Sequence, residues 1–344
     1  MNIDVDSPVV CICIPTYNAE LTIKDTLTSI LNQTYKNTMI QIVDNCSTDG
    51  TLAIVRSFEA PRITIYEHTE NIGGEGNFNR CIQLCKGDYT AIYHADDLYA
   101  QNMVQKQVEF LQTNTEVGAV FTEATFIDEA SREVGVFKLP SSFINENSIY
   151  DFPTLFASIL KHSNFLFCPS AMVRTDIYKN DIKAWRGELF ATSSDLDVWF
   201  RIAKAYSIGI LPLPLLHYRI SSQQWSAKVR RSSTKADFFL VMDYYLSEPF
   251  IKQLVTSNDL KNYNQLERRD RVIRAVNFLL QNKPLEAKSL CYDIFSLEAL
   301  YQGLRSKRGA LTFFLGGLTR FFIGCNIHVM GKVVFQRLLL KLNK

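Results

Sequence analysis

Apolar residues in the first hundred positions fall into short continuous runs, separated by segments in which they recur every three or four residues. Continuous runs are typical of strands buried on both faces of a sheet, and the longer spacing indicates amphipathic helices. The pattern predicts strands over residues 9–14, 40–43, 63–66 and 89–93, with helices over 19–33, 52–58 and 78–85. Four such alternations predict an α/β fold with a mostly parallel sheet flanked by helices.

The composition becomes helical after residue 225. Before that point the pattern predicts helices over 103–111, from Asp151 onward and over 192–203, a hairpin or connection over 129–152, and strands over 117–121, 168–174, 208–211 and 215–219. After it, helices are predicted over 236–246, 249–255, 266–280 and 285–295. We therefore expect a catalytic-type α/β domain at 1–225, a helical extension at 226–302 and a basic amphipathic tail at 303–344.

Charge and cysteine content narrow the functional classes. The net charge of +2 on 344 residues argues against nucleic-acid binding by the whole surface. Eight of the 37 Lys and Arg residues lie in residues 303–344, which contain no Asp or Glu, so the rest of the chain is mildly acidic. The eight cysteines form no C-x-x-C pair and are expected to be buried thiols in a reducing compartment. The acidic first residues do not resemble a secretory signal.

Two adjacent carboxylates, Asp96 and Asp97, follow the fourth predicted strand. At the carboxyl edge of a parallel sheet they would lie where open α/β sheets bind ligands. A divalent metal carrying a diphosphate would compensate their mutual repulsion, and the alternative is that they cap a helix N-terminus. The polar loops after the first two strands, at 15–18 and 44–51, end on the same edge. This convergence favours the metal–diphosphate site.

Six motifs occur in an order and spacing that resemble a known family. They are Ile-Pro-Thr-Tyr-Asn at 14–18, Val-Asp-Asn-Cys-Ser-Thr-Asp-Gly-Thr at 43–51, Asn-Ile-Gly with Asn-Phe-Asn-Arg within 71–80, Gly-Asp-Tyr leading to Asp-Asp within 87–97, Ser-Asp-Leu-Asp-Val-Trp-Phe-Arg at 194–201 and His-Tyr-Arg at 217–219. The first 225 residues thus resemble the family 2 glycosyltransferases. Those enzymes have a GT-A-type fold and transfer a sugar from a nucleotide-sugar to an acceptor with inversion.

The resemblance implies roles for individual residues. Residues of the nucleotide site would be Pro15, Tyr17 and Asn18 as one wall of the nucleoside pocket, Asp44 as an acceptor of a hydrogen bond from the base, Asn79, and Asp96 beside the ribose or diphosphate. Asp97 would hold a divalent metal, Mn²⁺ or Mg²⁺, and Asp195 would be the general base that deprotonates the acceptor hydroxyl.

Two positions depart from the family's pattern. His94 stands where the family often has a third acid, which leaves Asp97 as the main protein ligand. Ser194 stands where a Glu often precedes the base, so Asp197 is an alternative base. Two residues apart on a helix, the side chains of Asp195 and Asp197 point about 200° apart, and only one can face the acceptor. We expect that residue to be Asp195.

Two other motif residues receive local roles. Arg201 is expected to orient nearby carboxylates rather than touch the substrate. His217 is expected to be a histidine at a strand end that hydrogen-bonds to the backbone. The alternative is that it is a supplementary ligand of the metal or the diphosphate.

Aromatic residues flank Arg320 in the acid-free tail, at 313–314 and 321–322. Such a composition fits a helix that lies at an anionic lipid interface. The alternative is a helical subdomain that packs these aromatics on the catalytic domain or on a second subunit. Membrane contact is favoured because the charge bias has no evident use in a buried helix. We expect a cytoplasmic protein that is peripheral on the inner face of the cell membrane.

The combined expectation is an inverting, metal-dependent glycosyltransferase of bacterial surface-polysaccharide synthesis. Its donor would be a nucleotide-diphosphate sugar, with UDP preferred, and its acceptor a glycan or a polyprenyl-linked sugar. One alternative is a nucleotidyltransferase, although residues 15–20 lack the basic, glycine-rich loop that a triphosphate would need. The other is a protein that binds nucleotide-sugars without catalysis.

Overall fold

The computed structural model describes residues 7–221 and 232–342. The chain forms two compact units: Met1–Ser158 with Asn164–Ser221, and Ile159–Ser163 with Ser222–Lys344. The predicted domain boundary at residues 225 and 226 lies outside the described residues.

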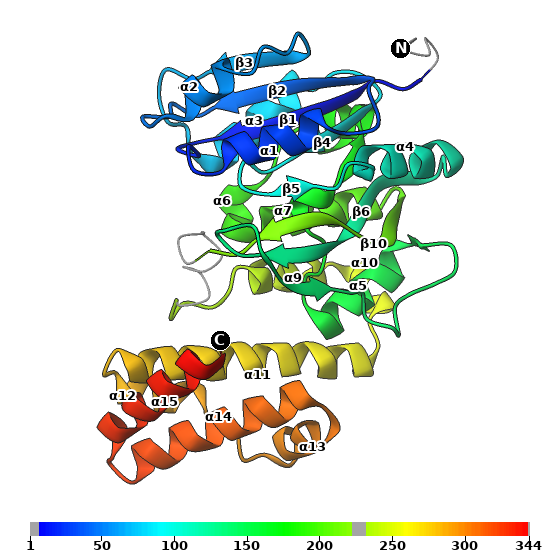
Figure 1. Ribbon diagram of the computed structural model, residues 1–344. Helices are drawn as coiled ribbons and strands as arrows, with labels where there is room; N and C mark the ends of the chain where they lie inside the picture. Colours follow the sequence, from blue (N-terminus) through cyan, green and yellow to red (C-terminus); the bar gives the residue numbers. More distant parts are fainter. Residues whose placement is uncertain (1–6, 222–231, 343–344) are drawn as a thin grey trace. The chain divides into compact units, whose positions relative to one another are not determined.

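A ten-stranded sheet forms the centre of the first unit (Figure 1). The strand order is β3-β2-β1-β4-β9-β6-β10-β5, with β7 beside β6 and β8 beside β10. The bounds are β1 (Val10–Thr16), β2 (Thr38–Asp44), β3 (Ile63–Glu67), β4 (Tyr89–Ile92), β5 (Leu98–Tyr99), β6 (Val117–Ile127), β7 (Glu133–Phe137), β8 (Ile149–Tyr150), β9 (Met172–Arg174) and β10 (Ser207–Arg219). The first four strands are parallel, as predicted, and β6 is parallel to β10.

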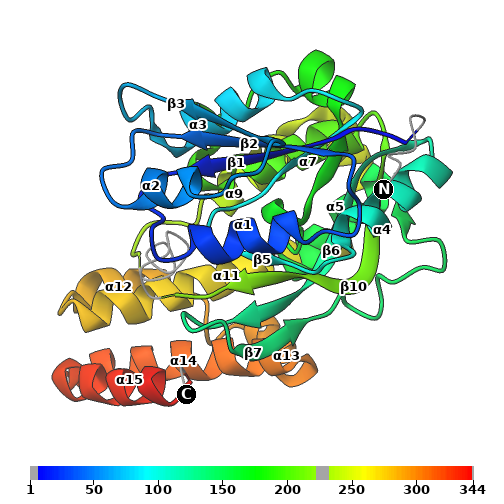
Figure 2. The same ribbon diagram turned by 45° about the horizontal axis from the view of Figure 1, so that its top comes forward.

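Different helices cover the two faces of the sheet, and Figure 2 shows α1 and α3 on opposite sides of β1. Alternate residues of β1, including Ile12, join α1 (Ile23–Leu31) and α4 (Met103–Thr113) in one buried cluster. On the other face the Cys13 thiol lies 3.7 Å from the Cys81 carbonyl of α3 (Gly73–Leu84). Further along that face, the Phe121 ring packs edge-on against Trp199 of α7 (Ser194–Ala203). Because both faces are covered, the strands read as continuous apolar runs.

Shorter helical segments complete the first unit. They are α2 (Thr51–Arg56), α5 (Phe152–His162), which continues into the second unit, the 3₁₀ turns η1 (Cys168–Ser170) and η3 (Ala191–Ser193), the π-helix η2 (Ile177–Ile182) and α6 (Gly187–Phe190). The helix predicted from Asp151 onward is present as α5, and Asp151 caps its start because Asp151 Oδ1 accepts a hydrogen bond from Thr154 N at 3.0 Å. All eight cysteines are free, and five of them are buried, in keeping with their expected role as core thiols.

Several predicted elements differ from the structure. The strand expected over 168–174 is a 3₁₀ turn followed by β9, which inserts antiparallel between β4 and β6. The two strands expected over 208–219 are one strand, β10, whose register shifts around Pro214 keep both halves in the sheet. Helix α3 begins at Gly73 rather than Phe78, because glycines at its start do not prevent a helix that is held by tertiary contacts.

The second unit is helical. Its helices are α9 (Phe238–Ser247), α10 (Pro249–Leu254), α11 (Ser257–Leu280), α12 (Pro284–Leu290), α13 (Leu297–Arg305), α14 (Lys307–Gly324) and α15 (His328–Leu342). Thr256 and Asp259 form a capping box at the start of α11, and α12 begins at Pro284, since proline suits the first turn of a helix. Helices α11, α12, α14 and α15 share one core, so the predicted extension and tail pack together. None of the described helices combines the length and apolarity needed to cross a bilayer.

Candidate active site

The candidate site lies at the carboxyl ends of the parallel strands. The loops after β1 and β2 carry Asn18 and Asp44, and the turn after β4 carries Asp96 and Asp97. Strand β10 runs in the same direction and ends at Arg219, which brings that residue to the turn after β4. The edge predicted from the strand-end loops is therefore formed by segments distant in sequence, and the bond between Arg219 and Asp97 joins residues 122 positions apart.

The loops after β1 and β2 are tied together by their polar side chains. Buried Asp44 accepts hydrogen bonds from Ser47 N at 2.9 Å and from Ser47 Oγ. Asn18 adopts a left-handed backbone with φ of 46°, its N–H donates to Ser47 Oγ at 3.0 Å, and its Oδ1 accepts from Thr48 N at 2.8 Å. Tyr17 is 49% exposed beside them, and Pro15 is half-buried. The loops that carry Pro15, Tyr17, Asn18 and Asp44 are thus neighbours joined by hydrogen bonds.

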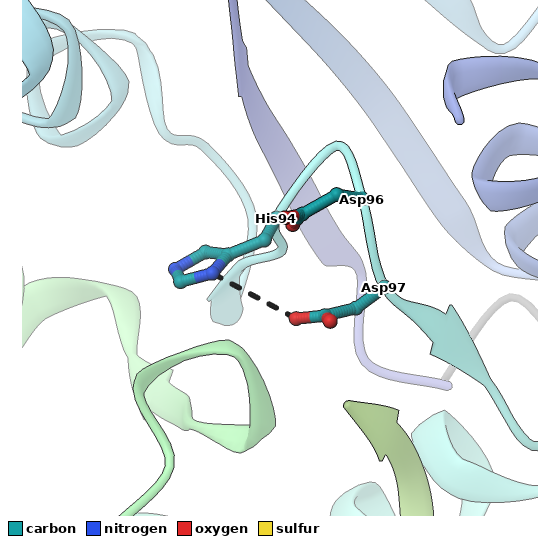
Figure 3. Close-up of side chains that lie close together, drawn as sticks. All are labelled: His94, Asp96 and Asp97. Atoms are coloured by element: carbon teal, nitrogen blue, oxygen red, sulfur yellow. Dashed lines mark ion pairs between the residues drawn. The ribbon is translucent and has the colours of Figure 1, made fainter. Parts of the chain in front are cut away.

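Asp97 is fully buried in the turn after β4, and Figure 3 shows the imidazole of His94 beside it. Its Oδ1 accepts a hydrogen bond from Arg219 N at 2.8 Å. Its Oδ2 lies 3.7 Å from His94 Nδ1 and accepts no hydrogen bond from the described residues. Ligand atoms of His94, Asp96 and Asp97 all lie within 4.8 Å of one another.

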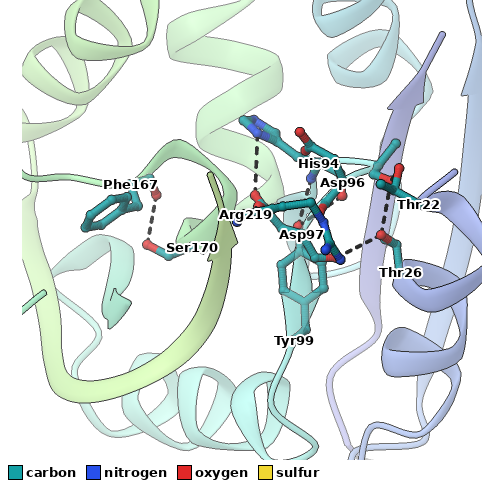
Figure 4. Close-up of polar contacts among 10 residues, drawn as sticks. Thr22, Thr26, His94, Asp96, Asp97, Tyr99, Phe167, Ser170 and Arg219 are labelled. Carbon is teal, nitrogen blue, oxygen red and sulfur yellow. Dashed lines mark hydrogen bonds and ion pairs between the residues drawn. The ribbon is translucent and has the colours of Figure 1, made fainter. Parts of the chain in front are cut away.

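The turn that presents these groups is fixed by hydrogen bonds from α1 and β10 (Figure 4). The hydroxyl groups of Thr22 and Thr26 donate to the Ala95 carbonyl at 2.9 and 3.0 Å, and Thr26 also donates to the Asp97 carbonyl at 2.8 Å. The Arg219 side chain donates from Nε to the Asp96 carbonyl at 2.7 Å. The sequence predicts no role for Thr22 or Thr26, and it marks Arg219 only as a motif residue. Only tertiary structure brings these three residues to the turn.

Burial perturbs the ionisation of this cluster. It raises the pKa of the Asp97 carboxyl well above its usual range, an effect that the neighbouring charge of Asp96 reinforces and Arg219 partly offsets. Burial also lowers the pKa of His94, which leaves the imidazole neutral at pH 7. A carboxylate oxygen and a neutral imidazole, both buried and short of hydrogen-bond partners, are suitable donors for a divalent metal. The residues present therefore fit such an ion.

The two acidic residues of α7 have different surroundings. Asp197 is fully buried and paired with Arg186, whose Nε lies 2.9 Å from Oδ2, and with Arg201, whose Nε lies 3.1 Å away. Arg201 also donates to the carbonyls of Ile182 and Ala184, which gives it the orienting position expected for it. Asp195 is half-buried, and burial raises its pKa to about 6. The charge of Asp197 is thus paired with two arginines, whereas the pKa of Asp195 is raised by burial.

The thiol of Cys168 is influenced by the charges of both Asp195 and Asp97. Burial raises the pKa of its thiol, and the charges of Asp195 and Asp97 raise it further. Both carboxylates therefore act electrostatically on one thiol, which lies in η1 next to Pro169. The sequence does not predict that Cys168 belongs to the site, since a single cysteine outside any motif does not indicate a function.

Asn79, a predicted residue of the nucleotide site, accepts a hydrogen bond at Oδ1 from Trp185 N at 2.7 Å. One turn earlier on α3, Glu75 Oε1 accepts from Gly187 N at 2.7 Å. The Trp185 ring packs on Phe78 with centroids 4.6 Å apart. These contacts hold the segment that carries Arg186 against α3, so Asn79 has a structural role at its Oδ1 atom.

Comparisons with known proteins agree with this geometry. Residues 11–181 match the family described as Glycosyl transferase family 2. A glucosyltransferase of Escherichia coli, WfaP, is named for transfer from UDP-Glc to α-D-GlcNAc-diphosphoundecaprenol, and is 26% identical over 267 residues, covering 74% of this chain and 98% of WfaP.

Two solved structures share the fold. S. aureus TarS, crystallised with UDP and with UDP-GlcNAc, is 17% identical with a TM-score of 0.58, and 92% of each chain is covered. The Pyrobaculum calidifontis mannosyltransferase PcManGT, in complex with GDP-Man and Mn²⁺, is 19% identical with a TM-score of 0.51, covering 96% of this chain and 87% of PcManGT. The motifs, the GT-A-type fold and these matches together establish that the chain belongs to glycosyltransferase family 2.

Proposed function

We propose that this glycosyltransferase transfers a sugar from a UDP-sugar to a lipid-linked glycan acceptor, with inversion and with a divalent metal, in surface-polysaccharide synthesis. The observation that carries the proposal is the cluster of His94, Asp96 and Asp97 at the carboxyl edge of the sheet, whose ligand atoms all lie within 4.8 Å of one another. Asp195, whose pKa burial raises to about 6, supplies a candidate base. A base is most effective when its pKa lies near the working pH, and a carboxyl group reaches that range only when it is desolvated.

In this mechanism Asp195 takes the proton of the acceptor hydroxyl as the acceptor oxygen attacks the anomeric carbon. The bond from that carbon to the diphosphate breaks in the same displacement, which inverts the configuration. Asp97 would hold the cation, which neutralises charge on the departing nucleoside diphosphate. The wall of Pro15, Tyr17, Asn18 and Asp44 would bind the nucleoside, and Asp96 would lie beside the ribose or diphosphate.

The choice of donor and acceptor rests on the relatives. TarS was solved with UDP and UDP-GlcNAc, and WfaP is named for a UDP-sugar donor and a diphosphoundecaprenol-linked acceptor. The WfaP match extends over 74% of this chain and 98% of WfaP. A polyprenyl-linked acceptor is also consistent with a chain that works at a membrane surface.

The second unit carries a surface suited to that location. On α13 the apolar side chains of Leu297, Leu300, Tyr301 and Leu304 recur at helical spacing and are exposed, Leu297 by 86% and Leu304 by 80%. Leu311, Phe314 and Phe321 of α14 are exposed as well. Exposed basic side chains at 305, 307 and 308 lie between the two sets in sequence, with no acid after residue 298. Apolar and basic residues together favour contact with anionic headgroups and hence a peripheral, cytoplasmic-face location.

Vesicle sedimentation of the full chain tests this location. Leu304→Glu combined with Phe314→Glu should reduce binding to phosphatidylglycerol-containing vesicles several-fold, because it removes apolar area and adds negative charge. Leu285→Glu on α12 is the matched control, since Leu285 is 77% exposed and lies outside this surface. Equal binding by both variants, or no binding by the native chain, would refute membrane contact.

Donor hydrolysis tests the reaction. With Mn²⁺ present, the native chain should cleave a UDP-sugar faster than the Asp97→Ala variant. A panel of nucleotide-sugars screened by thermal shift with Mn²⁺ would identify the donor, because a ligand of the folded state raises its stability. If native chain and variant hydrolyse every donor at the same rate, the enzymatic proposal is wrong.

A further inference from the structure

His94 is the least expected residue of the site. It occupies the position at which the family often has an acid, and the structure places its partly buried imidazole beside Asp97 (Figure 3). Its Nε2 atom is buried and makes no hydrogen bond with the described residues, and the same is true of Asp97 Oδ2. Buried polar atoms without partners are rare in folded proteins and require an explanation.

The separation of the two groups excludes a direct hydrogen bond. His94 Nδ1 and Asp97 Oδ2 are 3.7 Å apart, beyond hydrogen-bonding range. Two ligands of one small cation, bound at about 2.2 Å each and 90–110° apart, are separated by roughly 3.1–3.6 Å. The observed separation is close to that span, so a cation could contact both atoms after a small adjustment.

The imidazole is also held in place. Its backbone N–H donates to Tyr99 Oη at 2.8 Å, and Tyr99 stacks on Tyr93 with ring centroids 3.9 Å apart. The Phe78 ring contacts the imidazole edge-on at 5.8 Å. A histidine fixed by its backbone and by an aromatic neighbour loses little conformational entropy when it binds a metal.

We propose that His94 is a nitrogen ligand of the divalent metal, together with Asp97, and that it makes the site prefer Mn²⁺ over Mg²⁺. The proposal deepens the proposed function, on which it rests for the presence of a metal. Mg²⁺ strongly prefers oxygen ligands, whereas first-row transition cations accept imidazole readily. Replacing an acid by histidine therefore keeps the number of donors in the cluster while it changes the preferred cation.

Pulsed electron paramagnetic resonance of bound Mn²⁺ tests this assignment without an activity measurement. The full-length native chain with Mn²⁺ should show the hyperfine coupling of a directly bound ¹⁴N. His94→Asn should abolish that coupling, because asparagine offers an oxygen near the position of Nδ1. His68→Ala is the matched control, since His68 is half-buried after β3 and its Nε2 also makes no hydrogen bond with the described residues.

Binding titrations complete the test. Outer-shell substitutions already cost about 10–100-fold in metal affinity, so His94→Ala should weaken Mn²⁺ binding by at least about tenfold. His94→Asn should lower the ratio of Mn²⁺ to Mg²⁺ affinity. Circular dichroism confirms that each variant is folded. An absent ¹⁴N coupling in the native chain, a coupling that persists in His94→Asn, or unchanged Mn²⁺ affinity in His94→Ala would overturn the proposal.

Repeating the titrations with UDP separates the two proposals. If Mn²⁺ shows the ¹⁴N coupling but UDP does not tighten its binding, the ligand assignment holds and the nucleotide-dependent function fails. If UDP tightens Mn²⁺ binding and no ¹⁴N coupling is present, the function holds and the assignment of His94 is wrong.

Discussion

Asp195 and Asp197 lie two residues apart on α7, yet their replacement by asparagine should change stability in opposite directions. The pKa of Asp195 is raised from 3.8 to about 6 because the carboxyl group is desolvated. Because the folded-state pKa lies above the unfolded value, the fold loses stability as the pH rises from 3.8 to about 6, and the full cost of ionising Asp195 is present above that range. Asparagine resembles the neutral acid and removes that cost.

The size of the effect follows from the pKa shift. At 1.36 kcal/mol per pKa unit the shift corresponds to at most about 3 kcal/mol at pH 8. Because the side chain is only half-buried, solvent screening reduces this to about 1–2 kcal/mol. Asp195→Asn should therefore raise the melting temperature at pH 8 by roughly 2–8 °C. The gain should shrink at pH 5, where the native carboxyl group is mostly protonated in the folded state.

Asp197→Asn should destabilise the protein instead. Its carboxylate is fully buried between Arg186 and Arg201, and removing one partner of a buried ion pair costs about 3–5 kcal/mol. The loss is nearest the lower value, because Arg201 keeps its bonds to two backbone carbonyls. Catalytically, Asp195→Asn should lower kcat by about 10²–10⁴, the usual contribution of a general base.

Scanning fluorimetry at pH 8 and pH 5, with kcat measured under saturating donor, checks these expectations on the same preparations. A melting temperature that falls in Asp195→Asn would refute the desolvation argument. So would a gain that is equal at the two pH values. Unchanged kcat in this variant would refute its role as the base.

Three further expectations concern the site and the turn that precedes β4. The pH profile of kcat/KM should have an acidic limb near pH 6, because Asp195 acts only when deprotonated, and the limb should disappear in Asp195→Asn. Arg219→Lys should lower the free energy of unfolding by about 1.5–3 kcal/mol in urea titrations, because lysine cannot replace the bonds of Arg219 to the Asp96 and Asp128 carbonyls. Gly87→Ala should cost about 1–3 kcal/mol in the same assay, since Gly87 has φ of 77° and an added Cβ would lie 2.7 Å from the Val9 carbonyl oxygen. Unchanged urea midpoints would contradict the last two.

The sequence by itself determined the parallel part of the sheet and the edge that carries the site. Strands buried on both faces must be apolar throughout, so β1 to β4 were visible as continuous runs. Parallel strands connected by helices place their carboxyl ends on one edge of the sheet. The sequence alone therefore predicts that Asp44 and Asp97 lie on that edge. The motifs indicated the family, because several of them occur in the order that is typical of it.

Tertiary structure alone decided which site residues are paired with one another and how burial changes their pKa values. Only the fold places Arg186 on Asp197, which leaves Asp195 as the carboxyl group with a raised pKa. Likewise, the backbone N–H of Arg219 reaches Asp97 because β10 crosses to the turn after β4, and no local pattern encodes a contact across 122 residues. Periodicity reports which face of an element is apolar, whereas burial and charge pairing depend on the distant segments that pack against it. The same reason explains β9, whose three residues become a strand only between β4 and β6.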